Sequence, residues 1–152
     1  GDAQGVPHFA LGMSRFFEVT PAATPVARPD ITPDLTVRMV DFGYEFPADI
    51  KAGPQVWEVI NDGPQPHEML LMRVVDGHTI DEALASLMSE SPDGPPVAIP
   101  VGGVQGLQAG LSNYLDFDLA PGDYIVVCYV PDAASGQPHA ALGMISTFTV
   151  AN

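Results

Sequence analysis

The sequence predicts an all-β protein, a Greek-key β-sandwich with one short helix and an extended N-terminal segment. The chain has 152 residues, of which 46% are hydrophobic, so it can bury the core of one ordinary domain. It contains 15 glycines and 16 prolines, which favours many short elements joined by turns over a helical bundle. Several segments also alternate apolar and polar residues with a period of two, as half-buried strands do.

The expected strands can be followed along the chain from these alternating or apolar segments and from the turns between them. We expect strands over residues 35–41, 55–61, 69–75, 114–119, 124–129 and 145–150. Phe42, Tyr44 and Phe46 continue the first of these on one side. Residues 69–75 are apolar nearly throughout, which predicts a central strand. About seven antiparallel strands in two packed sheets follow from this pattern.

The helix and one long loop are expected between the strands at 69–75 and 114–119. Thr79 and Glu82 have the spacing of a capping box, which predicts a short helix that ends at about Met88. Residues 91–106 are rich in proline and glycine, so the sequence predicts a long loop there.

An internal repeat links the two ends of the chain. Residues 5–13 read GVPHFALGM, and residues 136–144 read GQPHAALGM. The match continues in register with Phe17 and Phe148 and with Val19 and Val150. Residues 1–20 are therefore interpreted as an N-terminal strand segment that repeats the C-terminal one, followed by a proline-rich linker at 21–31 and the main domain at 32–152.

Two explanations of the repeat remain open. Either the chain is cut from a tandem of such domains, or residues 6–20 pair as a strand with another sheet edge, which includes self-association. His8 and Met13 match His139 and Met144, but no cysteine precedes them. They are either ligands left from an absent domain or inert.

The charge of the chain restricts its partners. The formal net charge is −14 with five basic residues, which makes nucleic acid and anionic membranes poor partners. The acidic surface either attracts a basic protein partner or only keeps the chain in solution. No apolar run approaches the roughly 20 residues of a transmembrane segment. No signal peptide is visible, so we expect a mature form or a fragment.

The candidate site lies in residues 128–144, which contain the only cysteine. Cys128 is followed by a turn-rich loop, by His139 and then by Met144. A thiolate, an imidazole and a thioether are the soft ligands that copper prefers, and a second histidine, His67, ends the turn at residues 61–66. Two histidines, a cysteine and a weak axial methionine are typical of an electron-transfer copper centre.

These residues resemble those of the cupredoxin family over most of residues 32–150. The resemblance rests on residues 61–67, on the turn at 121–124 that leads to Cys128, and on residues 139–144. It implies one type 1 (blue) copper ion bound by His67, Cys128, His139 and axial Met144. It also implies a non-enzymatic, exported protein, periplasmic or extracellular, that carries single electrons between redox partners.

Two departures from the family pattern concern the rigidity of the site. Ten residues separate Cys128 from His139, more than in plastocyanin-like members, although copper nitrite reductases have longer loops. Glu68 stands where an asparagine commonly ties the ligand loops together.

We also expect a solvent-facing edge of His139 to be the electron port, surrounded by the following residues: Pro138, Ala140, Ala141 and Leu142.

Other functions have weaker support in the sequence. Cys128 and two histidines are also a chemically possible zinc site, and we expect zinc there as a substituted metal rather than the native one. Coupled copper oxidases need more than the four histidines present, and a triad of Ser135, His139 and Asp132 lacks a nucleophile elbow. The alternative from another class is a structural or assembly module on this scaffold, with or without copper, that uses strand exchange through its N-terminal segment.

Overall fold

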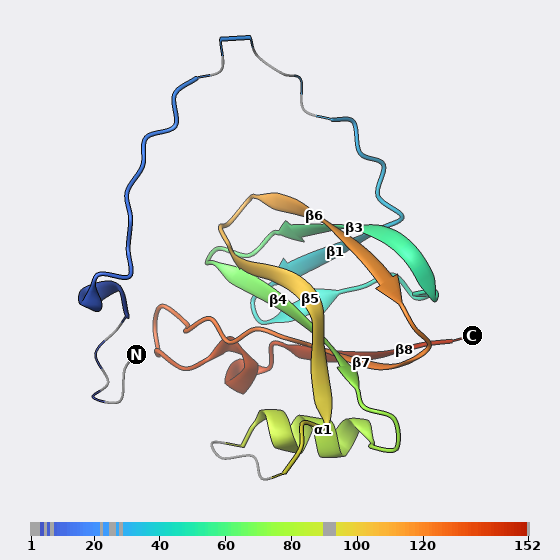
Figure 1. Cartoon of the computed structure of the whole chain (residues 1–152). Helices are drawn as coiled ribbons and strands as arrows, with labels where there is room; N and C mark the ends of the chain where they lie inside the picture. The colour runs from blue at the N-terminus through green and yellow to red at the C-terminus, as the bar shows by residue number, and fades with distance from the viewer. Residues whose placement is uncertain are drawn as a thin grey trace. The chain divides into compact units, whose positions relative to one another are not determined.

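The computed structural model describes Gln4, Val6 and residues 8–21, 23–24, 27, 29–89 and 94–151. The chain divides into two compact units, Gly1–Ile31 and Thr32–Asn152. The second unit contains the strands and the α-helix, and it is shown with the rest of the chain in Figure 1. None of the helices in the described part of the chain has the length and apolar character that a membrane span requires.

The second unit is a sandwich of two four-stranded sheets. The first sheet consists, in spatial order, of β2 (Gly43–Glu45), β1 (Leu35–Val40), β3 (Gly53–Asn61) and β6 (Ser112–Leu119). The second consists of β5 (Ala98–Leu107), β4 (His67–Val74), β7 (Gly122–Val127) and β8 (Ile145–Val150). The predicted all-β sandwich is confirmed. One pair departs from the expected antiparallel arrangement, because β1 and β3 run parallel.

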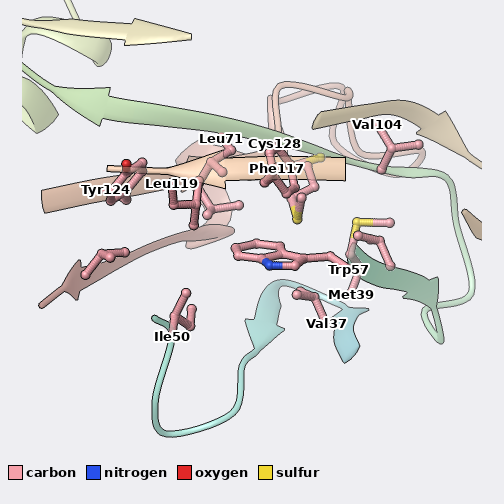
Figure 2. Packing of buried hydrophobic residues seen from close by; sticks show 14 of the residues in the cluster. Val37, Met39, Ile50, Trp57, Leu71, Val104, Phe117, Leu119, Tyr124 and Cys128 are labelled. Atoms are coloured by element: carbon pink, nitrogen blue, oxygen red, sulfur yellow. The ribbon is translucent and has the colours of Figure 1, made fainter. Parts of the chain in front are cut away.

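The main core fills the space between the two sheets. Val37 and Met39 alternate with more exposed neighbours along β1, as a half-buried strand requires, and both are fully buried. Trp57 is also fully buried, and its ring lies 4.8 Å from that of Phe117 between centroids. In Figure 2 the indole of Trp57 lies in the middle of this cluster, with Val37 on one side and Cys128 on the other. The candidate cysteine is therefore part of the main core.

A second, smaller core explains why β4 is apolar on both faces. Helix α1 (Ile80–Leu87) covers the outer face of the second sheet, where its Ala83 packs with Met72, Val74 and Ile125. β4 lies between β5 and β7, as predicted for a central strand. The predicted capping box is confirmed, because the Glu82 amide donates to the Thr79 hydroxyl and the Thr79 amide donates to the Glu82 carboxylate.

The loop predicted over residues 91–106 is wrong for its second part, which forms strand β5. Residues 90–93 lie outside the described part of the chain. Gly103 has a φ of +148°, and a Cβ there would lie 1.9 Å from the carbonyl oxygen of Met69. The pairing of β4 and β5 also shifts register between Leu71 and Met72. The glycines and prolines of this segment therefore belong to an irregular edge strand, a position in which both residue types are tolerated.

The repeated sequence forms the same local structure in both units. A 3₁₀ helix, η1, spans His8–Leu11, and η2 spans His139–Leu142. Each is followed by a glycine with positive φ, +88° at Gly12 and +109° at Gly143. Residues 13–21 form no strand within this chain. Their pairing with another sheet edge stays a prediction.

Candidate metal centre

Three chain segments bring the predicted ligands to one end of the sandwich. His67 is the first residue of β4, and Cys128 directly follows β7. These strands are neighbours, with Leu70 opposite Val127, so their ends lie side by side. His139 begins η2 and Met144 directly precedes β8, which pairs with β7.

The three strongest donors face one another in the interior. The Nδ1 atoms of His67 and His139 are 3.0 Å apart, and Cys128 Sγ lies 3.3 Å from His139 Nδ1. One donor atom from each of the three residues lies within 4.8 Å of the others, and all three side chains are fully buried. This is the spacing at which a single ion can bind a sulfur and two nitrogens.

Met144 is held beside this group through its backbone. The Met144 amide donates to the His139 carbonyl over 2.9 Å, and its own carbonyl accepts from the Cys128 amide over 3.2 Å. The side chain is fully buried and belongs to the same core cluster as Cys128. Met144 is therefore bound through its backbone to two of the predicted ligand residues, and its thioether is buried in the core that contains the thiol.

The buried site favours the uncharged forms of its own groups. Burial raises the pKa of the Cys128 thiol, against the opposing effect of amide donors from Glu68 and Val130. Burial, and then the charge of neighbouring His67, lowers the pKa of His139. The Nε2 atom of His139 is buried and has no hydrogen-bond partner among the described residues. A bound cation would stabilise the thiolate and would use the imidazole lone pairs, so this donor set fits a metal.

Asn61, which the sequence analysis did not single out, fixes the turn that leads to His67. Its amide donates to the carbonyls of Gln65 over 2.9 Å and Leu107 over 2.7 Å, and its side-chain oxygen accepts from the Gly63 amide over 2.9 Å. The side chain is fully buried. An asparagine ahead of a Gly-Pro turn was the available signal, because Asx side chains commonly organise such turns.

Glu68 ties the two ligand strands together in place of the asparagine of the family pattern. Its carboxylate accepts from the Tyr129 amide over 2.6 Å, and its amide points to Cys128 Sγ over 3.4 Å. The Tyr44 hydroxyl donates to the Glu68 carbonyl over 2.7 Å. Glu68 therefore links the two strands, although it replaces the asparagine of the family pattern.

The long segment between Cys128 and His139 folds back on itself. The amide and hydroxyl of Ser135 both donate to the Asp132 carboxylate over 2.7 Å, and these bonds lower the pKa of Asp132 to about 2. The Asp132 amide donates to the Gln137 carbonyl, and the His139 amide donates to the Val130 carbonyl. No hydrolytic triad forms among these described residues, since Nδ1 of His139 faces sulfur and His67.

The expected solvent-facing edge of His139 is wrong. The His139 side chain is fully buried, and the ring of Phe42 packs against it with a centroid distance of 4.9 Å. Pro138 and Ala141 are exposed, but Ala140 is buried. This contact cannot be predicted from local patterns, because Phe42 lies far from His139 in the chain.

The sequence analysis left the roles of two residues of the N-terminal copy, His8 and Met13, open. The side chain of His8 lies outside the described residues. The Met13 side chain is 77% exposed. Whether either binds a metal stays untested.

Comparisons with solved structures identify the fold. The chain is similar to an auracyanin from Roseiflexus castenholzii, with a TM-score of 0.52 and 20% identity over 77% of this chain and 95% of that one. It is also similar to auracyanin B, with a TM-score of 0.50 and 22% identity over 82% of this chain and 94% of that one. Auracyanins are blue copper cupredoxins. The chain has the cupredoxin fold.

One further solved structure matches in part. A copper-containing nitrite reductase from Thermus scotoductus SA-01 matches with a TM-score of 0.43 and 20% identity over 88% of this chain and 25% of that one. No family model and no curated protein matches the sequence.

Proposed function

We propose that this cupredoxin binds one copper ion through His67, Cys128 and His139, with Met144 as a weak axial ligand, and carries single electrons between redox partners. The observation that carries the proposal is the buried group of one thiol and two imidazoles whose donor atoms lie within 4.8 Å. Bound copper would supply a one-electron couple between Cu(I) and Cu(II). The same set of a thiolate, two imidazoles and a thioether is typical of blue copper sites.

The surroundings of the ligands suit electron transfer because they restrict movement. Asn61 fixes the turn before His67, and Glu68 links the start of β4 to the residue after Cys128. Ligands held by such contacts keep one geometry in both oxidation states, which lowers the reorganisation that each electron transfer requires. Burial of the group also excludes water from the thiolate.

We infer the charge of the redox partner from the charge of this chain, and the compartment from the family resemblance. A chain with a formal net charge of −14 attracts a basic redox protein at long range. Phe42 is half-buried and its ring contacts His139, so electrons would leave the site towards the surface through this ring. We place the protein outside the cytoplasm, in the periplasm or at the cell exterior, as the cupredoxin resemblance implies.

Substitution of the thiol tests the proposal. The purified apo-protein is titrated with Cu(II), and the thiolate-to-copper absorption band is compared between the wild type and a Cys128→Ser variant. The band should be lost in this variant and retained in His78→Gln, which removes a histidine that contacts Glu82 on helix α1, away from the ligand group. A copper spectrum that is unchanged in Cys128→Ser would contradict the proposal.

The second candidate function is an assembly module that uses strand exchange. It is favoured by residues 13–21, which form no strand and carry exposed apolar side chains: Met13 (77%), Phe16 (96%), Phe17 (82%) and Val19 (79%). Such a segment can add to the open edge of a sheet in another molecule. The whole chain should then self-associate, and deletion of residues 1–20 should give a monomer in light scattering. The same mass per particle before and after deletion would exclude this function.

A further inference from the structure

The second ring nitrogen of His67 has a charged partner. Nε2 of His67 lies 2.5 Å from Oδ1 of Asp41, the residue that directly follows β1. The histidine is fully buried, and the Asp41 side chain is 26% exposed. An ionised carboxylate can only accept hydrogen bonds, so Nε2 must carry the proton. The lone pair of the neutral ring is then on Nδ1, the atom that faces His139 and belongs to the candidate metal group.

The contact between His67 and Asp41 is enclosed by Gly63. A Cβ at Gly63 would lie 2.5 Å from His67 Nε2 and 3.0 Å from Asp41 Oδ1. The backbone at Gly63 does not have a positive φ, so glycine is needed here for space rather than for conformation. The amide of Gly63 is itself fixed by the side chain of Asn61. A side chain at position 63 would therefore collide with the pair of His67 and Asp41.

The other carboxylate oxygen of Asp41 is also held. Oδ2 accepts from Gln65 Nε2 over 3.0 Å, and the same nitrogen donates to Asp132 over 3.2 Å. The Gln65 oxygen accepts from the Ala133 amide over 3.1 Å. Asp41 is thus oriented by a glutamine that contacts the loop between Cys128 and His139. Both of its oxygens have defined partners.

We propose that Asp41 is a positioning residue of the metal centre, which fixes the Nε2–H tautomer and the orientation of His67 and strengthens Nδ1 as a donor. This inference rests on the proposed copper function. Carboxylates that accept from the distal nitrogen of a ligating histidine raise its basicity, and their loss typically weakens metal binding about 10–100-fold. A more basic imidazole stabilises Cu(II) more than Cu(I), so Asp41 lowers the reduction potential of the site.

The test compares Asp41→Asn with Asp116→Asn, which removes the same charge from an exposed position in β6. We expect Asp41→Asn to weaken Cu(II) binding about 10–100-fold, measured by chelator competition. We also expect its reduction potential to rise, since Cu(I) binding weakens less. The Asp116→Asn variant should match the wild type in both measurements. A merely structural role of Asp41 would lower the urea midpoint of the apo-protein without raising the potential.

A copper-free measurement tests the tautomer directly. In ¹⁵N-labelled apo-protein at neutral pH, NMR should show the proton of the His67 ring on Nε2 in the wild type. Gly63→Ala, which forces the pair apart, should disturb this tautomer and weaken Cu(II) binding in the same direction as Asp41→Asn. A proton on Nδ1 in the wild type overturns the inference.

The outcomes for the two proposals can be told apart. A wild type with a thiolate-to-copper band, together with equal Cu(II) affinity and potential in Asp41→Asn and Asp116→Asn, overturns the role of Asp41 alone. A wild type without the band overturns both the copper function and the role of Asp41.

Discussion

The substitution Asn61→Ala tests whether the first ligand turn depends on one buried side chain. The variant loses two donated hydrogen bonds, to the Gln65 and Leu107 carbonyls, and one accepted from the Gly63 amide. At about 1 kcal/mol for each bond, the loss is about 3 kcal/mol, and groups left unsatisfied add to it. With a urea m-value of about 1.5 kcal/mol/M, the unfolding midpoint of the apo-protein should fall by about 2 M.

Two further variants separate this effect from a general cost of removing an amide. Asn113→Ala removes an exposed asparagine whose oxygen accepts one bond from the neighbouring Tyr114 amide, and it should cost less than about 1 kcal/mol. Asn61→Asp keeps the oxygen that accepts from Gly63, but it turns a carboxylate towards two carbonyls and should be at least as unstable as Asn61→Ala at neutral pH. Equal urea midpoints for Asn61→Ala and Asn113→Ala would refute the reasoning.

Other perturbations address the edge strand, the helix and the buried ionisable groups. Gly103→Ala places a Cβ 1.9 Å from a backbone oxygen of β4, so it should lower the urea midpoint strongly, whereas Gly43→Ala, which meets nothing closer than 4.0 Å, should change it little. Thr79→Ala removes the helix cap and should cost about 1 kcal/mol in urea unfolding; an unchanged midpoint would show that the capping box adds no stability. The apo-protein should be most stable between about pH 6.5 and 8.5, the ordinary pKa values of histidine and cysteine. Below this window the unfolded state takes up a proton that buried His139 resists, and above it the unfolded thiol ionises while that of Cys128 does not. The fall between about pH 8.5 and 10 should be absent in Cys128→Ser, and its persistence there would assign it to other groups. Above about pH 10 the tyrosines whose pKa is raised by burial, Tyr44 among them, should lower the stability of both proteins.

The sequence allowed the sandwich and the grouping of the candidate ligand residues to be predicted, and their role as ligands stays a prediction. Alternation along β1 and the apolar run in β4 follow from which faces are buried. The prediction that Cys128, His139 and Met144 come together rested on residue type and spacing, and the structure brings them to one end of the sandwich.

The features that were missed depend on contacts between distant parts of the chain. The glycines and prolines of strand β5 predict a loop, because the neighbours that require glycine there, such as Phe117 at Gly102, are brought close only by the fold. Asp41 contacts a residue 26 positions away, and Asn61 contacts one 46 positions away. The burial of His139 depends in part on packing against Phe42. None of these partners can be identified from spacing alone.

The most direct test of the central claim is the visible absorption spectrum of the purified apo-protein during titration with Cu(II). The arrangement of His67, Cys128 and His139 predicts an intense thiolate-to-copper charge-transfer band that saturates at one copper ion per chain. The absence of such a band, with the Cys128 thiol shown to be free and reduced, would contradict the claim and leave a cupredoxin fold without blue copper chemistry.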